Sequence, residues 1–235
     1  MRRIQNLMEQ WLFIGPDNRQ EQVNLPHTWN AKDGQDGGND YYRGTCHYEK
    51  TFEKPEFDPE TEEVYLEFLG VNASSDVTVN GKELAHHDGG YSTFRINITE
   101  VLEDQNKLEV TVDNSVNGKV YPQKADFTFY GGIYRDVRFL IVSKEHFDLD
   151  YLGSNGIKIT PEVKENEANV HIETFTNTEE AQVNVQIKDQ DGKVVAEGNG
   201  CDANLNIQNP IRWHGRKNPY LYTAVATLTV NGEVK

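Results

Sequence analysis

Apolar and polar residues alternate along most of this chain. Segments such as Leu108–Val112, Val170–Glu173 and Val183–Ile187 place their apolar side chains on one face of an extended backbone. These segments are short, lie about ten residues apart and have no helical pattern between them. Two sheets of this kind must bury their apolar faces against each other. The sequence therefore predicts an all-β chain made of antiparallel sandwiches.

Turn dipeptides between the alternating segments support this prediction. They tolerate positive φ and predict tight hairpins at Asn80-Gly81, Asn117-Gly118, Asp191-Gly192 and Asn231-Gly232. The only helical element that we expect is a single turn at Thr99–Leu102, with Thr99 as its cap.

The composition changes near Ser143–Phe147. The preceding part is rich in aromatic residues and glycine, and the following part is plainer. We therefore expect two domains, residues 1–144 and 145–235, with the boundary near residue 145. The second has about 90 residues, close to the ~100 of an immunoglobulin-like sandwich.

The charge and the apolar runs exclude several partners. Lys and Arg total 23 against 38 Asp and Glu, a net charge of −15, so the chain repels phosphate backbones and we expect no nucleic-acid partner. No apolar run approaches the ~18 to 20 residues of a membrane span, so we expect no membrane partner. Polar residues after Met1 argue against a secretory signal, so we expect a cytoplasmic protein or one whose signal was removed. Cys46 and Cys201 are expected to be reduced thiols.

The segment Asp126–Gly132 has the most unusual composition, with one acid, three aromatic residues and two glycines. A sugar pairs its hydroxyls with carboxylates and stacks its ring faces on aromatic side chains, while glycines let the backbone come near a ligand. Alternatively, the aromatic residues belong to the core and Asp126 accepts hydrogen bonds from turn amides. Composition alone favours this second interpretation.

Three other segments have simpler interpretations. His86 and His87 are neighbours on an extended chain and lack a third ligand, so we expect no metal site there; Asp88 is expected to accept a hydrogen bond at a loop with a close backbone approach. The glycine-rich stretch Asp33–Asp40 is either a surface connection or a loop shaped around a polar ligand. Trp213 with Pro219–Tyr222 is interpreted as aromatic packing where a strand enters the sandwich.

Catalytic signatures are missing from the sequence. It contains no Gly-x-Ser-x-Gly, P-loop or HExxH motif, and no pair of carboxylates in a recognisable context. We therefore expect no catalytic residue and no cofactor in this chain.

Several motifs together closely resemble the amino-terminal domain of glycoside hydrolase family 2, which includes β-galactosidases, β-glucuronidases and β-mannosidases. The motifs follow one another through the whole first part, and Trp213–Tyr222 resembles the end of the second domain of that family. They are Asn24–Trp29 (NLPHTW), Tyr42–Phe52 (YRGTCHYEKTF), Val77–Lys82 (VTVNGK), His87–Phe94 (HDGGYSTF), Val112–Asn114 (VDN) and Tyr130–Val137 (YGGIYRDV).

The resemblance implies a fold and a function. It implies a jelly-roll, galactose-binding-like sandwich followed by an immunoglobulin-like sandwich, which in the family precede a (β/α)₈ barrel with the catalytic glutamates. The chain ends at Lys235 before any barrel sequence. We therefore expect a non-catalytic amino-terminal fragment, truncated at its C-terminus, of a homo-oligomeric retaining β-galactosidase.

The resemblance also implies site residues. The family's acid at the start of the Asp126 segment helps to bind the terminal sugar at the rim of the barrel pocket, and we expect Asp126 to do so here. By analogy His87, Asp88 and the loop Asp33–Asp40 are expected near the same rim. Three alternatives stay open: a freestanding carbohydrate-binding module, a fragment of a β-glucuronidase, or two sandwiches that serve only as packing and oligomer surfaces.

Overall fold

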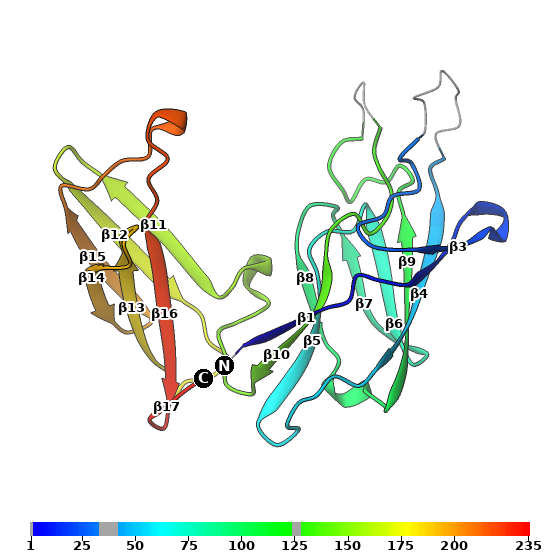
Figure 1. Cartoon of the computed structure of the whole chain (residues 1–235), viewed down its shortest axis with the longest axis horizontal. Helices are drawn as coiled ribbons and strands as arrows, with labels where there is room; N and C mark the ends of the chain where they lie inside the picture. Colours follow the sequence, from blue (N-terminus) through cyan, green and yellow to red (C-terminus); the bar gives the residue numbers. More distant parts are fainter. Residues whose placement is uncertain (1, 33–41, 124–127) are drawn as a thin grey trace. The chain divides into compact units, whose positions relative to one another are not determined.

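The computed structural model describes residues 2–32, 42–123 and 128–235. The chain divides into two compact units, Arg2–Val142 and Ser143–Lys235. Strands dominate both units, and the prediction of an all-β chain is confirmed (Figure 1). Among the described residues, no helix has the length and apolar character that crossing a membrane requires.

The first unit is a jelly-roll β-sandwich of two sheets. Its four-stranded sheet has the order β1 (Arg3–Asn6), β10 (Val137–Ser143), β5 (Glu62–Phe68), β8 (Phe94–Asn97). Its six-stranded sheet has the order β3 (Gln20–Val23), β2 (Trp11–Ile14), β4 (Thr45–Glu53), β9 (Gln105–Asp113), β6 (Ser74–Val79), β7 (Lys82–Asp88).

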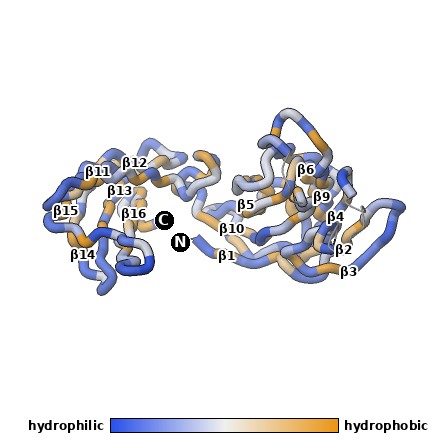
Figure 2. Tube along the Cα trace, turned by 90° about the horizontal axis from the view of Figure 1, so that it is seen from above, coloured by the Kyte–Doolittle hydropathy of each residue, from blue (hydrophilic) through white to orange (hydrophobic). Residues whose placement is uncertain are grey.

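Period-two alternation explains the core of this unit. Strand β9 buries Leu108, Val110 and Val112 completely, while the residues between them face outward. The hydrophobic stretches of β6 and β9 are orange in Figure 2. Trp11 is also fully buried, and its Nε1–H donates a hydrogen bond to the carbonyl oxygen of Leu7 at 2.9 Å. The polar tip of this large ring is therefore satisfied inside the core.

A buried carboxylate joins three strands of the four-stranded sheet. Glu67 on β5 has no exposed side-chain surface. It accepts hydrogen bonds from Arg95 Nε of β8 at 2.7 Å and from Arg138 Nε of β10, and Arg2 lies 3.7 Å away. These charges compensate the cost of burying the carboxylate.

The second unit is an immunoglobulin-like sandwich. One sheet has the order β11 (Ile157–Val163), β12 (Glu167–Thr174), β15 (Asp202–Gln208). The other has the order β14 (Val194–Asn199), β13 (Gln182–Lys188), β16 (Thr223–Val230), β17 (Glu233–Val234). Ile172, Val185 and Leu228 are at most 2% exposed and lie at the centre of the core.

Three of the four predicted hairpin turns are confirmed. Asn80-Gly81 joins β6 to β7 and Asn231-Gly232 joins β16 to β17, each with positive φ at both residues, and Asp191-Gly192 lies between β13 and β14. The prediction at Asn117-Gly118 is wrong. That pair lies in the loop after β9, where Asn117 Oδ1 accepts a hydrogen bond from the backbone N–H of Lys119 at 2.9 Å.

The four short helical segments are single 3₁₀ turns. They are η1 (Pro16–Asn18), η2 (Thr99–Val101), η3 (Tyr151–Gly153) and η4 (Gly215–Lys217). Segment η2 confirms the predicted turn, but Thr99 does not cap it. Ile98 occupies the N-cap, and Thr99 Oγ1 instead accepts a hydrogen bond from Val64 N–H at 2.9 Å, which ties the turn to β5.

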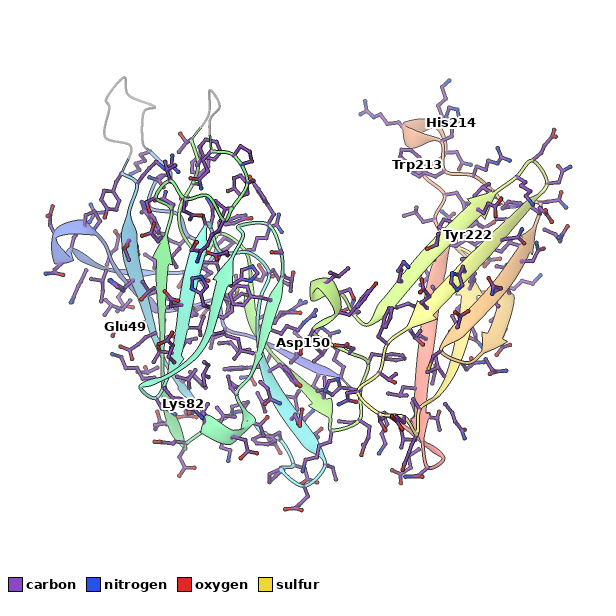
Figure 3. All side chains as sticks on the ribbon, turned by 180° about the vertical axis from the view of Figure 1, so that it is seen from behind. Glu49, Lys82, Asp150, Trp213, His214 and Tyr222 are labelled. Carbon is purple, nitrogen blue, oxygen red and sulfur yellow. The ribbon has the colours of Figure 1, made fainter. Side chains whose placement is uncertain are left out.

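The prediction that Trp213 packs in the sandwich is wrong. Its side chain is 64% exposed, and Leu221 is exposed to the same extent. Figure 3 places Trp213 and His214 on the loop that carries η4, and Tyr222 close to the start of β16. Only Tyr222 contacts the core of the unit, and its hydroxyl oxygen accepts a hydrogen bond from Ile211 N–H at 2.9 Å.

Candidate functional site

Four tyrosines from two connections between strands surround a pocket of about 250 Å³ in the first unit. We call it the tyrosine pocket. Tyr91 lies between β7 and β8, the other three tyrosines lie between β9 and β10, and Asn72 lies between β5 and β6. The described lining residues are Asn72, Tyr91, Tyr121, Thr128, Phe129, Tyr130 and Tyr134.

Asn72 forms hydrogen bonds with several of the segments that line the pocket. Its backbone N–H and carbonyl both pair with Gly132, at 3.0 and 3.2 Å. Its Oδ1 accepts a hydrogen bond from the Tyr121 hydroxyl at 2.6 Å, and its Nδ2 donates to the carbonyl oxygen of Tyr130. One buried side chain therefore connects its own loop to two segments of the β9–β10 connection, because a buried amide must satisfy all its polar atoms.

The glycines beside the pocket serve protein packing. At Gly90 a Cβ atom would collide with the side chain of Asn72, and at Gly131 it would collide with the ring of Trp29. At Gly132, where φ is +130°, a Cβ would lie 2.5 Å from the carbonyl oxygen of His27. The close backbone approach expected at Gly90 is confirmed. For Gly131 and Gly132 the neighbour that requires glycine is the protein itself, whereas one of the two interpretations of the sequence assigned these glycines to the approach of a ligand.

The pocket presents ring faces and neutral hydroxyls. Tyr91 and Tyr121 have ring centroids 4.8 Å apart, and Tyr91 and Tyr130 are exposed. Burial raises the pKa of Tyr121 and of Tyr134, so both hydroxyls stay protonated. None of the seven described lining residues carries a charge. Such a surface suits a ligand with both apolar ring faces and hydroxyl groups.

Two predicted features lie outside the described residues: Asp126 and the loop Asp33–Asp40. Thr128, two positions after Asp126, is a lining residue of the tyrosine pocket. The assignment of Asp126 as a sugar-binding residue stays a prediction.

His87 lies at the end of β7 and packs inside the first unit. Its ring stacks on Phe94 with a centroid distance of 4.2 Å. Its Nε2 lies 3.1 Å from the carbonyl oxygen of Gly89 and 3.0 Å from Ser92 Oγ. Burial lowers the pKa of His87. His87 is not among the lining residues of the tyrosine pocket.

Asp88 follows His87 and is engaged by its neighbours. The Ser74 hydroxyl donates to its Oδ1 at 2.6 Å, and His86 Nε2 and Lys119 Nζ lie 3.1 and 3.6 Å from its Oδ2. The hydrogen bond from Ser74, together with the contact of His86, holds the pKa of Asp88 below its ordinary value. Asp88 therefore accepts hydrogen bonds at a loop, as expected, and does not line the tyrosine pocket. Its role toward a sugar stays a prediction.

A metal centre has no candidate in the described part of the chain. There, no three His, Cys, Asp or Glu side chains are grouped so that they could hold a metal ion. His86 is instead placed between Asp76 at 2.6 Å and Asp88.

Sequence reasoning missed Asn72 and Tyr121 as pocket residues. Asn72 begins a glycosylation sequon, Asn72-Ala73-Ser74, which does not indicate a pocket residue, and Tyr121 lies outside every motif that carried the resemblance. Tyr91 and Tyr130 do belong to two of those motifs. The presence of a tyrosine in each motif is the signal in the sequence that could have pointed to the pocket.

Comparison with known proteins identifies both units. Residues 38–148 match the glycosyl hydrolase 2 galactose-binding domain-like model, and residues 154–235 match the model of glycosyl hydrolases family 2. A β-glucuronidase of Bacteroides fragilis is 34% identical over 230 residues, which cover 90% of this chain and 33% of that protein. A β-galactosidase of Thermoanaerobacter pseudethanolicus is 28% identical, with coverage of 99% and 34%.

A solved structure agrees with this assignment. The crystal structure of an FMN-binding β-glucuronidase from Facaelibacterium prausnitzii L2-6 superimposes with a TM-score of 0.91 at 38% identity, over 100% of this chain and 38% of that protein. The chain thus spans about a third of the length of the relatives it matches. Two models of one family match successive parts of the chain, and the B. fragilis relative and the solved structure are both named β-glucuronidases. The chain therefore belongs to glycoside hydrolase family 2.

Proposed function

We propose that this chain is the non-catalytic part of a family 2 glycoside hydrolase that removes terminal β-linked sugars. The observation that carries the proposal is the match of both sandwiches, in order, to that family. The chain supplies the jelly-roll and the immunoglobulin-like units, and residues elsewhere in a longer polypeptide supply the chemistry.

The chemistry of glycoside hydrolysis explains why we assign the catalytic residues to another part of the polypeptide. Retaining glycosidases need two carboxyl groups ~5 to 5.5 Å apart, one as nucleophile and one as acid and base. The described carboxylates with shifted pKa values, such as Asp88 and Asp113, are held by Ser74 and by Ser115 and Thr45, and their pKa values are lowered. A general acid needs a raised pKa. In the proposed division the first unit helps to bind the sugar, and both catalytic carboxyl groups belong to the rest of the polypeptide.

The sugar is β-galactose or β-glucuronate. The amino-acid sequence of the segment Ala125–Gly132 favours a β-galactosidase. Relatives carry both names, and the B. fragilis β-glucuronidase shares more identity with this chain than the T. pseudethanolicus β-galactosidase. Glucuronate carries a carboxylate that galactose lacks, so we expect the enzyme to prefer one of the two sugars. An assay that compares them identifies the substrate.

The experiment is an assay of the longer polypeptide on nitrophenyl β-galactoside and nitrophenyl β-glucuronide. We expect hydrolysis of one of them with kcat/KM at least tenfold above the other. The 235-residue chain is the control, and we expect it to hydrolyse neither. If the longer polypeptide failed on every β-glycoside, or if the control hydrolysed one, the proposal would be wrong.

Asp126 provides a second test. In the longer polypeptide, Asp126→Asn removes a charged hydrogen bond to the sugar, so we expect kcat/KM to fall roughly 10- to 150-fold. Asp136→Asn, also acidic and close in sequence, is the matched control and is expected to keep activity. If both variants kept the activity of the unmodified protein, the result would favour the alternative in which the two sandwiches serve only as packing and oligomer surfaces.

A freestanding carbohydrate-binding module is the second candidate, because the tyrosine pocket is formed by the first unit alone. Calorimetric titration of the 235-residue chain with galactose, lactose and glucuronate distinguishes the two. A dissociation constant tighter than ~1 mM would favour the module. Weaker or undetectable binding is expected if the pocket is completed by other residues.

A further inference from the structure

Three tyrosines of the tyrosine pocket already use their hydroxyl protons inside the protein. Tyr121 donates to Asn72 Oδ1 at 2.6 Å, and Tyr134 donates to the carbonyl oxygen of Gly90. The hydroxyls of Tyr91 and Tyr121 also share a hydrogen bond. Because the one proton of Tyr121 lies on Asn72, Tyr91 is the donor in that bond. The hydroxyl oxygens of Tyr121 and Tyr134 therefore keep lone pairs for a ligand but offer no proton.

The amide of Asn72 is used within the protein as well. Its Oδ1 accepts from Tyr121, its Nδ2 donates to the carbonyl oxygen of Tyr130, and the residue is only 5% exposed. Of the hydroxyl groups on the described lining residues, those of Thr128 and Tyr130 are the ones that donate to no described residue. The pocket therefore presents more hydrogen-bond acceptors than donors.

Aromatic rings form most of the surface of the pocket. Five of its seven described lining residues are aromatic. The rings of Tyr91, Tyr121 and Phe129 form a row with centroid distances of 4.8 and 6.2 Å. The row begins at the surface, where Tyr91 is 60% exposed, and ends at Phe129, which is buried. Aromatic rings attract one another at these distances, so a ligand ring can join the row.

Two guanidinium groups lie against rings of the pocket without lining it. Arg43 lies 5.6 Å from the ring centroid of Phe129, and Arg135 lies 5.2 Å from that of Tyr134. Each donates to a backbone carbonyl oxygen, at 3.0 and 3.1 Å, and neither is a lining residue. A carboxylate in the pocket would therefore meet hydroxyl oxygens and no charged donor from the described lining residues.

These properties distinguish three classes of ligand. A hexose carries several hydroxyl groups, and each one that is buried without a partner lowers the affinity. A carboxylate accepts hydrogen bonds but donates none, so it does not match a pocket rich in acceptors. A phenol has two apolar ring faces and a single hydroxyl group that can donate. The pocket matches the phenol best.

We propose that the tyrosine pocket binds a neutral phenol. Its ring packs against the row of Tyr91, Tyr121 and Phe129, and its hydroxyl group donates to the hydroxyl oxygen of Tyr134. Tyr134 is the acceptor because the oxygen of Tyr121 already accepts from Tyr91. This site goes beyond the proposed function and does not depend on it, because it requires neither the catalytic carboxyl groups nor the terminal sugar.

An NMR titration of the ¹⁵N-labelled 235-residue chain gives both the affinity and the location of binding. The probe is 4-methylphenol, which is neutral at pH 7 like a tyrosine side chain. We expect it to shift the amide signals of Tyr91 and Phe129. The amides of Ile159 and Leu221, two exposed apolar residues of the second unit, report non-specific binding and should not shift.

Three further probes test the chemistry of the ligand. The matched control is 4-methylanisole, which keeps the ring and the oxygen atom but cannot donate a hydrogen bond. An anionic ring is represented by 4-methylbenzoate, and a sugar by methyl β-galactoside. We expect 4-methylphenol to bind roughly fivefold more tightly than each of them, or better, because one hydrogen bond distinguishes it from the matched control.

Substitutions in the pocket separate the hydrogen bond from the ring contact. Tyr134→Phe should weaken 4-methylphenol roughly fivefold and leave 4-methylanisole unchanged. Tyr65→Phe also removes a tyrosine hydroxyl in the first unit, one that donates to Glu63 at 3.2 Å, and it should leave both affinities unchanged. Tyr91→Ala removes an exposed ring of the row, so it should fold and should weaken both ligands.

Several outcomes would overturn the proposal. One is 4-methylanisole or methyl β-galactoside binding as tightly as 4-methylphenol. Another is a shift of Ile159 and Leu221 without a shift of Tyr91 and Phe129. The longer polypeptide should bind 4-methylphenol with the same dependence on Tyr134, and loss of binding there would assign the pocket to packing within that polypeptide. Binding is measured without hydrolysis, so a longer polypeptide that bound the phenol but cleaved no β-glycoside would contradict only the proposed function.

Discussion

The two units use the same alternating pattern but differ in what covers their strands. In the first unit, the inward residues of β9 are completely buried between two sheets. In the second unit, the inward residues of β12 are buried, whereas Ile159 and Val163 of β11, which pair with buried residues of β12, are 45% and 51% exposed. Alternation therefore determines which face of a strand points inward. Whether that face is buried depends on the strand that lies opposite.

The largest expected effect contrasts the two tryptophans. Trp11→Ala removes a fully buried ring and its hydrogen bond to Leu7, so we expect it to destabilise the first unit by about 3 to 5 kcal/mol. Trp213→Ala removes an exposed ring, so we expect a change within about 0.5 kcal/mol in this chain. Urea denaturation followed by circular dichroism measures both.

If Trp11→Ala does not fold, Trp11→Phe replaces it. This variant keeps an aromatic ring and loses the indole N–H, and we expect it to cost about 1 kcal/mol. A large loss of stability on Trp213→Ala in the 235-residue chain would mean that this ring packs against other residues and is not exposed.

The next effect contrasts the ion pairs. Glu67→Gln leaves the buried Arg95 and the partly buried Arg138 beside a neutral amide, so we expect a loss of about 3 kcal/mol in the first unit. Glu173→Gln in the second unit removes the exposed pair with Lys158, and we expect no measurable shift of its unfolding midpoint. Thermal unfolding of the two variants provides the comparison. Equal shifts would contradict the difference in burial.

Glycine substitutions test how closely the backbones pack. Gly132→Ala combines a φ of +130° with a collision against His27, so we expect a loss of about 2 to 4 kcal/mol. Gly192→Ala in the second unit also has a positive φ, but nothing lies within 4 Å of the added Cβ, and we expect about 1 to 2 kcal/mol. Urea denaturation measures both. A smaller loss at Gly132 than at Gly192 would show that the first-unit backbone relaxes to accept a methyl group.

The sequence predicted most of the strands but not their burial. Val183–Ile187 and Leu108–Val112 became strands because a period of two is a local property. Trp213 was misassigned because the packing of a loop side chain depends on tertiary contacts, which no local pattern records, and its ring is 64% exposed. Asn117-Gly118 was misassigned because Asn117 bonds to Lys119 of its own loop, and the next strand among the described residues, β10, begins only at Val137.

The tyrosine pocket was predictable only in part. Tyr91 and Tyr130 belong to separate motifs. Asn72 bonds to Tyr121 and to the carbonyl oxygen of Tyr130, and the ring of Tyr121 packs against that of Tyr91. Long-range hydrogen bonds of this kind leave no trace in residue spacing. The expected roles of His87 and Asp88 came from a motif, and the motif does not distinguish a ring stacked on Phe94 from one facing a ligand.

The smallest expected effect concerns two neighbouring histidines of the first unit, which have no counterpart in the second. Hydrogen bonds with Asp76 and Asp88 raise the pKa of His86, whereas burial lowers the pKa of His87. The folded chain holds the His86 proton more tightly than the unfolded chain, so this contribution is complete below the unfolded pKa near ~6.5 and is lost as pH rises through the higher folded value. For His87 the contribution is complete above ~6.5 and is lost as pH falls through the lower folded value.

Proton NMR titration of the imidazole rings measures these two pKa values directly. We expect the midpoint of His86 above ~6.5 and that of His87 below it. Asp76→Asn removes the stronger partner of His86, so its midpoint should fall while that of His87 stays unchanged, because His87 is held by Phe94 and Ser92. His86 is half exposed, so the accompanying change in the unfolding midpoint should be small. Equal midpoints for the two histidines would mean that neither the carboxylates nor burial controls their protonation, and the assignment of Asp88 as a partner of His86 would then be wrong.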